Sequence, residues 1–231
     1  MNNYFKKILV IAAHPDDETL GCGGLIAKAI SLNNDIRVVF IAEGSSSRFK
    51  KNDSNIEIKK AISKREESAL KALEFLGVKE KEIFFNYRKC CQLDDYPLLE
   101  ITKEIESHIN SFKPTCIITH NPNDTNIDHR ICYQALLPAV RPLKNCTLKL
   151  GLLFEILSSS EWNYLNQFEP NFFVDITNEL ESKINSCNLY EGEMFANNHP
   201  RSPESIKALA KIRGNQSGHK YSEGFKLIFF R

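Results

Sequence analysis

The sequence lacks a marked excess of charge of either sign. Lysine and arginine together number 30 and aspartate and glutamate 29, so the formal net charge is only +1. Proteins that bind nucleic acid or an anionic membrane surface through electrostatics normally carry an excess of basic residues. We therefore expect neither nucleic acid nor an anionic membrane surface as a partner.

Long apolar runs are also missing. No apolar segment approaches the roughly 18 residues that a helix needs to cross a bilayer, so we expect no membrane span. Residues 1–7 lead straight into a strand-like run and lack the apolar core and cleavage site of a secretion signal. The seven cysteines contain no Cys-x-x-Cys pair, and an odd number without a signal indicates reduced thiols. These absences predict a cytoplasmic protein.

No repeat, low-complexity tract or shift in composition interrupts the 231 residues. With 42% hydrophobic and 26% charged residues, the chain has an ordinary globular composition and can bury a core of its own. We therefore expect a single domain over residues 1–231. A homo-oligomer is left open.

Apolar runs of strand length alternate with stretches of helical periodicity. The first run, residues 7–12, is rich in β-branched residues and suits a strand buried on both faces of a parallel sheet. Further strands are expected at residues 36–42, 82–87, 115–119, 148–157, 172–175 and 225–230. Helices are expected at residues 25–32, 56–76, 98–112 and 177–195, with two more ending near residues 140 and 213. This alternation predicts an α/β fold with a mostly parallel sheet flanked by helices.

Two polar clusters directly follow predicted strands. Residues 13–18, with the sequence Ala-His-Pro-Asp-Asp-Glu, come after the first strand, and residues 120–130 come after the fourth. In sheets of this kind, ligands bind beyond the carboxyl ends of the strands. We therefore expect both clusters at the same edge of the sheet, where they can meet.

The residue types in these clusters suit a catalytic zinc site. Such sites commonly take three protein ligands from His, Asp and Glu and leave a fourth position for water. His14 and Asp17 can both face one ion across the turn at Pro15, and the Asp128-His129 pair can supply a third ligand. The intervening Asp16 can then lie beside the bound water and take its proton.

Each feature also has a plainer structural explanation. A histidine at a strand end often only forms hydrogen bonds in a loop, and acidic residues before a helix act as N-caps and offset its dipole. Residues 21–24, Gly-Cys-Gly-Gly, lack the full pattern of a phosphate loop, so the glycines indicate close helix packing. The adjacent Cys90 and Cys91 are poorly placed for metal or redox chemistry. The presence of both polar clusters at one sheet edge nevertheless favours a metal site.

These motifs resemble those of the PIG-L/LmbE-type zinc-dependent N-deacetylases. Residues 13–18 match the family's signature hexapeptide in full, and residues 119–124 and 127–130 resemble its second motif. Supporting similarity at residues 65–77 and 213–225 extends the resemblance over nearly the whole chain. The resemblance implies a Rossmann-like fold and hydrolysis of the N-acetyl group of an amino sugar.

The resemblance also implies roles for individual residues. His14, Asp17 and His129 would bind Zn²⁺, or another divalent metal such as Fe²⁺. Asp16 would be the general base for the attack of a metal-bound water. Arg48 and Arg65 lie where family members contact substrate.

Three further residues are expected to support the site from their positions in the two motifs. Glu18 would support the turn, and His120, at the end of its strand, would contact the site without binding the metal. Asp128, next to the predicted ligand His129, is placed in the same supporting group.

One position departs from the family pattern. Three residues before the last ligand, the family often carries a second histidine, thought to stabilise the oxyanion, and this sequence has Asn126. Asparagine can donate a hydrogen bond to an oxyanion but cannot act as a general acid. We expect Asn126 to be catalytic as that donor. Asp16 would then protonate the leaving amine, with His120 and His219 as alternatives.

The sequence thus predicts a zinc-dependent hydrolase that removes an N-acetyl group from an amino sugar in a glycan, glycolipid or sugar-nucleotide precursor. Its partner would be this small N-acylated sugar. The motifs describe the metal and not the substrate pocket, so hydrolysis of another N-acyl substrate, such as a formylated or antibiotic-like amine, is an alternative. A non-catalytic nucleotide-binding α/β module, whose acidic loop binds no metal, is the alternative from another class.

Overall fold

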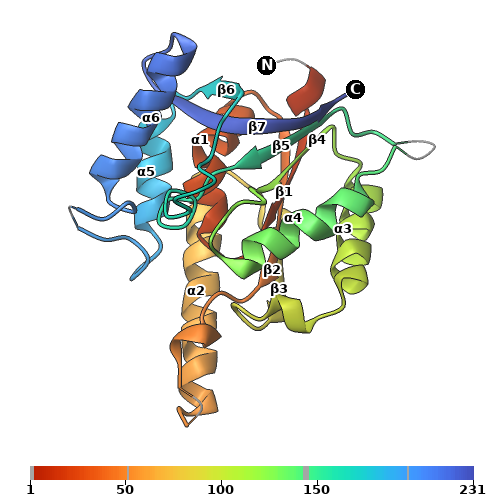
Figure 1. Cartoon of the computed structure of the whole chain (residues 1–231), viewed down its shortest axis with the longest axis vertical. Helices are drawn as coiled ribbons and strands as arrows, with labels where there is room; N and C mark the ends of the chain where they lie inside the picture. The colour runs from red at the N-terminus through yellow and green to blue at the C-terminus, as the bar shows by residue number, and fades with distance from the viewer. Residues whose placement is uncertain (1–2, 51, 143–145, 197) are drawn as a thin grey trace.

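A seven-stranded sheet with the order β3-β2-β1-β4-β5-β7-β6 forms the centre of the molecule (Figure 1). The structure is a computed structural model that describes residues 3–50, 52–142, 146–196 and 198–231. The strands are β1 (Lys7–Ala12), β2 (Asp35–Ala42), β3 (Ile83–Arg88), β4 (Cys116–His120), β5 (Leu150–Phe154), β6 (Phe172–Asp175) and β7 (Ser222–Phe230). Strands β1 to β5 pair in parallel, whereas β7 is antiparallel to β5 and β6. The predicted single α/β domain with a mostly parallel sheet is confirmed.

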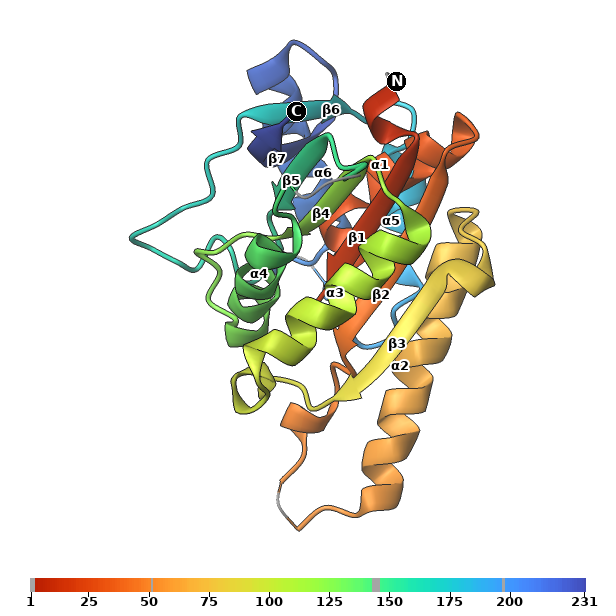
Figure 2. The same cartoon turned by 90° about the vertical axis from the view of Figure 1, so that its right-hand side faces the viewer.

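Helices cover both faces of this sheet (Figure 2). Side chains of β1 alternate between two cores: Ile8 and Val10 pack into one, and Leu9 and Ile11 into the other. The first core is completed by α1 (Asp17–Ser31), α2 (Asn55–Phe75), α5 (Leu180–Asn188) and α6 (Pro203–Ser217). The second core is completed by α3 (Leu98–Phe112) and α4 (Ile127–Ala139). Burial on both faces explains why the central strands are continuous apolar runs.

Helix α1 begins earlier than predicted. We expected a helix from residue 25, with residues 21–24 outside it, but the helix starts directly after the turn at Pro15 and Asp16 and continues through a kink. The kink lies at Cys22, whose φ and ψ are −145° and 24°. A Cβ at Gly21 would lie 2.6 Å from the ring of Phe154, so this glycine allows α1 to pack closely on β5.

Two other predicted elements are shorter than expected. The strand predicted at residues 148–157 is β5, which ends at Phe154, and the helix predicted at residues 177–195 is α5, which ends at Asn188. The residues freed by these earlier ends form loops that contribute to the site described below. Within the described part of the chain, no helix is both long and apolar enough to cross a membrane.

Candidate active site

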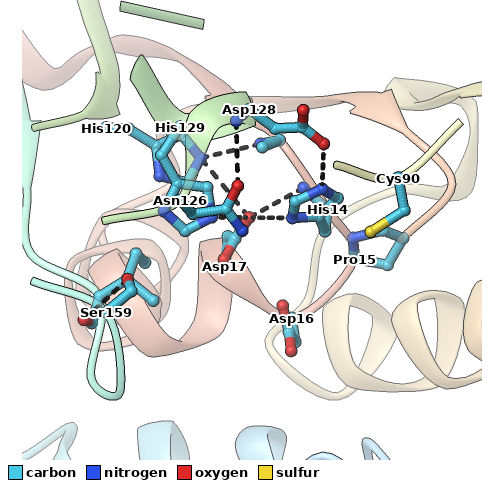
Figure 3. A network of polar contacts seen from close by, with 12 residues as sticks. His14, Pro15, Asp16, Asp17, Cys90, His120, Asn126, Asp128, His129 and Ser159 are labelled. Carbon is cyan, nitrogen blue, oxygen red and sulfur yellow. Dashed lines mark hydrogen bonds and ion pairs between the residues drawn. The ribbon is translucent and has the colours of Figure 1, made fainter. Parts of the chain in front are cut away.

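The two polar clusters lie side by side at the carboxyl ends of β1 and β4, which are neighbours in the sheet. Figure 3 shows His14, Asp17 and His129 converging there. The ligand-type atoms of these three residues all lie within 4.8 Å of one another, and the three residues are buried. The fold therefore brings together the three residues predicted to bind the metal.

Asp17 occupies the centre of this cluster. Its Oδ2 lies 3.5 Å from Nδ1 of His14 and 3.4 Å from Nε2 of His129. The same oxygen accepts a hydrogen bond of 2.8 Å from the backbone N–H of His14. Asp17 is the first residue of α1, so the turn at Pro15 and the start of the helix together fix the position of this carboxylate.

Each histidine contacts a second carboxylate through its other ring nitrogen. Nε2 of His14 lies 2.8 Å from Oδ2 of Asp128, and Nδ1 of His129 lies 3.1 Å from Oδ1 of Asp124. A carboxylate at the far nitrogen fixes the tautomer and the orientation of a metal-binding histidine. The arrangement therefore directs Nδ1 of His14 and Nε2 of His129 toward Asp17.

Two loops hold these orienting carboxylates in place. Asp128 accepts hydrogen bonds from the backbone N–H groups of Cys91 and Leu93, in the loop after β3, at 2.6 and 3.0 Å. Asp124 accepts hydrogen bonds from the hydroxyls of Ser159 and its neighbour, in the loop after β5, at 2.8 and 2.9 Å. Both carboxylates are thus fixed by groups outside the two sequence motifs.

Charge and burial in the cluster fit a divalent cation. Burial lowers the pKa of His14, but hydrogen bonds to Asp128 and Asp17 outweigh it and raise this pKa to about 10. Burial likewise lowers the pKa of His129, but the charge of Asp17 and the contact with Asp124 raise it to about 9. Nε2 of His129 is buried and has no hydrogen-bond partner among the described residues. Two histidines and a carboxylate are a donor set of catalytic zinc sites, so these residues suit Zn²⁺.

Asp16 lies beside this cluster, and Figure 3 shows its carboxylate apart from the three converging side chains. Its Oδ2 accepts hydrogen bonds from Arg65 at 2.8 Å and from Arg201 at 2.7 Å. Its Oδ1 is buried without a hydrogen-bond partner in the described part of the chain. Burial raises the pKa of Asp16, although the two arginine charges oppose this. The φ of Asp16 is 126°, a strained conformation of the kind that occurs at functional sites.

The two arginines predicted to contact substrate both pair with Glu193. Arg65 is buried, and it donates to Glu193 at 2.5 Å and to the carbonyl oxygen of Pro15 at 2.8 Å. The side chain of Arg48 is 54% exposed and donates to both carboxylate oxygens of Glu193, at 2.5 and 2.6 Å. Arg65 therefore holds Asp16 and its turn in place, whereas Arg48 is the more exposed of the two side chains. Substrate contact by either stays a prediction.

Glu18 and His120 support the backbone of the first motif. Glu18 accepts a hydrogen bond of 3.1 Å from the backbone N–H of Asp16 and a second from the hydroxyl of Tyr190. Nε2 of His120 accepts a hydrogen bond of 2.8 Å from the backbone N–H of Ala13. Both side chains thus fix the turn from which the predicted ligands project.

Neither alternative proton donor for the leaving amine suits that role. Burial lowers the pKa of His120 far below its usual range, and its Nε2 is an acceptor, so the ring is neutral. His219 is exposed, and its Nδ1 lies 3.9 Å from Asp175 at the end of β6. Asp16 is the remaining candidate of the three.

Asn126 is the N-cap of α4. Its Oδ1 accepts a hydrogen bond of 2.9 Å from the backbone N–H of Asp128, which identifies the other terminal atom as the amide nitrogen. In Figure 3 this nitrogen points toward the cluster of His14, Asp17 and His129. The cap therefore leaves a hydrogen-bond donor facing the candidate metal position.

The sequence did not predict three residues that the structure places at the site: Asp124, Glu193 and Arg201. Asp124 lies inside the second motif, five residues before His129, and this position in the motif could have indicated a contact between the two side chains. Glu193 and Arg201 come from the segment between α5 and α6, which carries no periodicity or motif that points to β1. Their contacts depend on tertiary packing alone.

Comparison with known proteins identifies the family of this chain. Residues 9–140 match the family model of PIG-L, described as GlcNAc-PI de-N-acetylase. The chain is 27% identical over 239 residues to the diacetylchitobiose deacetylase of Thermococcus kodakarensis, and the match covers 98% of this chain and 84% of the relative.

Solved structures share the fold over nearly the whole chain. The diacetylchitobiose deacetylase of Pyrococcus horikoshii has a TM-score of 0.77 at 21% identity, covering 96% of this chain and 84% of that one. A 4-carboxy-2-hydroxymuconate hydratase from Pseudomonas putida has a TM-score of 0.75 at 20% identity, covering 98% and 97%. A shared fold therefore does not assign the reaction by itself. The family match extends over more than half of the sequence and includes both motifs, so the chain belongs to the PIG-L family of deacetylases, which are amide hydrolases.

Proposed function

We propose that this deacetylase removes the acetyl group from an N-acetylated amino sugar, with Zn²⁺ bound by His14, Asp17 and His129. The convergence of these three side chains within 4.8 Å is the observation that carries the proposal. The family match and the relative named for diacetylchitobiose favour a substrate that contains N-acetylglucosamine. Because the chain belongs to a family of amide hydrolases, the alternative of a non-catalytic nucleotide-binding module is not supported.

A divalent cation bound there would polarise the amide carbonyl and lower the pKa of water toward about 7. Asp16 takes the proton from the attacking water through Oδ1, which is buried and has no partner among the described residues. Burial raises the pKa of Asp16 against the opposing charges of Arg65 and Arg201, so the carboxylate accepts a proton more readily than an exposed one. Arg65 and Arg201 hold the other oxygen and fix the orientation of the carboxylate.

Asn126 provides a hydrogen bond to the developing oxyanion. Its oxygen is occupied by the cap of α4, so the amide N–H groups are left to donate to the amide oxygen of the substrate as negative charge builds up. Asn126 has no proton to give to the leaving amine. Asp16, which carries the proton taken from water, returns it to the nitrogen.

Acetate release from a panel of N-acetylated sugars tests this function. We expect turnover of N-acetylglucosamine or its oligosaccharides by zinc-loaded protein, and loss of turnover after chelation. N-formyl and longer N-acyl analogues in the same panel distinguish an acetyl-specific enzyme from a hydrolase of another acyl group. Failure to hydrolyse any amide in the panel would reject the substrate class.

Asp16→Asn tests the base. The variant should keep one equivalent of zinc, because Asp16 contacts none of the three ligands, while kcat falls by about 10²–10⁴-fold. Asp94→Asn, which changes an exposed carboxylate, is the matched control and should leave kcat unchanged. Normal turnover by Asp16→Asn with zinc bound would show that the base is another group.

A further inference from the structure

A second group of metal-binding side chains lies on the other side of the His14 ring. The ligand-type atoms of His14, Cys90 and Asp128 lie within 4.8 Å of one another, and all three residues are buried. Figure 3 shows Cys90 on one side of His14, and Asp17 with His129 on the other. A thiol, a carboxylate and an imidazole are donors that Zn²⁺ binds, and the thiolate favours thiophilic ions further.

The loop after β3 fixes Cys90 in this position. Its backbone N–H donates to Glu43 at 2.9 Å, and its sulfur accepts a hydrogen bond of 3.2 Å from the hydroxyl of Ser47. The next residue, Cys91, has a φ of 57°, and its N–H donates to Asp128. The sharp turn at Cys91 thus holds the thiol and the carboxylate on the same side of the loop.

The two groups share His14, but a neutral imidazole can serve only one of them. It offers one lone pair to a metal and carries one N–H. Nδ1 lies 3.5 Å from Asp17, and Nε2 lies 2.8 Å from Asp128. A cation bound through Nδ1 leaves the Nε2–H to donate to Asp128. A cation bound through Nε2 requires the proton on Nδ1, which removes His14 from the first set of ligands.

We propose that His14, Cys90 and Asp128 form a second, inhibitory position for a thiophilic divalent cation of the Zn²⁺ or Cd²⁺ type. On binding, the S–H bond of Cys90 breaks, a sulfur–metal bond forms and the proton passes to solvent, with no oxidation or reduction. The ring proton of His14 moves from Nε2 to Nδ1. The first position keeps the hydrogen bond between His14 and Asp128, so it fills first. Excess metal then fills the second position, and the first cation loses His14 and keeps only Asp17 and His129 as ligands. A metal-binding Cys90 would differ from the sequence expectation, under which the adjacent Cys90 and Cys91 are poorly placed for metal chemistry.

Cadmium is the probe, because a cadmium–thiolate bond gives an ultraviolet charge-transfer absorption that does not depend on activity. Protein loaded with one equivalent of Zn²⁺ is titrated with Cd²⁺ while absorbance and acetate release are followed together. We expect a thiolate band that saturates near one added equivalent, with a parallel loss of activity. Cys90→Ser should abolish the band and raise the Cd²⁺ concentration for half-inhibition by at least about tenfold, because a ligand is lost.

Cys91→Ser and Cys146→Ser are the matched controls, because both remove exposed thiols outside the group. Both should keep the band, and Cys90→Ala should lose it as Cys90→Ser does, with circular dichroism to verify folding. Three outcomes would overturn the proposal: no band in the unmodified protein, a band retained without Cys90, or a band lost in either control. The band is recorded whether or not a sugar is hydrolysed, so this proposal and the proposed function can fail separately.

Discussion

Asp16 and Asp17 are adjacent in the sequence, yet their carboxylates contact different partners. Asp17 begins α1 and faces the two histidines. Asp16, just before the helix, has a φ of 126°, and its carboxylate faces two arginines. The strained backbone between them separates a predicted metal ligand from a predicted base. A motif of consecutive acidic residues can therefore supply two kinds of chemistry.

Arg201 provides the first test at this scale. It touches Asp16 and none of the three predicted ligands, so Arg201→Ala should keep zinc bound while kcat falls. A hydrogen bond to a charged group contributes about 1.5–3 kcal/mol, which corresponds to about 10–100-fold in rate. Arg201→Lys should recover part of kcat with KM unchanged. Equal kcat in all three proteins would remove Arg201 from the positioning of the base.

The predicted ligands could be found from the sequence because each lies within a short motif after a strand. His14 and Asp17 are three residues apart. His129 follows β4, which lies parallel to β1, so the ends of both strands bring the three residues to the same edge of the sheet. Arg201 could not be found in this way. Its contact with Asp16 joins residues 185 positions apart, and no local pattern records such a pairing.

At the scale of elements, the kink in α1 is stabilised by an ion pair from two other elements. Glu223 of β7 accepts hydrogen bonds from the backbone N–H groups of Gly24 and Leu25 at 2.8 and 2.7 Å. Lys183 of α5 donates to the carbonyl oxygen of Leu20 at 2.8 Å and to Glu223 at 2.6 Å. Backbone groups that a helix break leaves free are thus satisfied by buried charges. Glu223 therefore stabilises the kink of α1 and does not contact the cluster around Asp17.

Breaking this pair should destabilise the whole fold. Lys183→Met leaves the Glu223 carboxylate buried without its cation, so the free energy of unfolding should fall by about 3–5 kcal/mol. Adding Glu223→Gln should recover part of the loss, because the unpaired charge disappears. Urea unfolding measures both. Lys64→Met breaks an exposed pair with Glu191 and should change stability little. A similar small effect of Lys183→Met would show that the pair is dispensable.

Over the whole molecule, the alternation of strands and helices was enough to predict the sheet and its parallel centre. The strand order at the end of the sheet that contains β5, β6 and β7 was not predictable in the same way. Strand β7 is the last in the sequence but lies between β5 and β6, antiparallel to both, and it brings α6 against the first core. Such an insertion depends on long-range packing of the chain end, which local periodicity does not encode.

Metal binding should couple the site to the stability of the whole chain. In the metal-free protein the pKa values of His14 and His129 are raised to about 10 and about 9, from about 6.5 when unfolded. The protonated rings therefore stabilise the fold fully below pH about 6.5, and this contribution is lost as pH rises through about 9–10. Bound Zn²⁺ replaces those protons, so the stability gap between zinc-loaded and metal-free protein should widen with pH across this range.

Zinc at about a thousandfold excess over Kd should stabilise by about 4 kcal/mol, which raises Tm by on the order of 10 °C for a chain of this size. Thermal unfolding with zinc or with chelator, at several pH values between 6.5 and 9, measures the gap. His129→Ala should lose most of the gap, because a ligand is removed, whereas His108→Ala, outside the cluster, should keep it. A gap of constant size over this pH range would mean that zinc does not compete with the protons of His14 and His129, and would place the metal elsewhere.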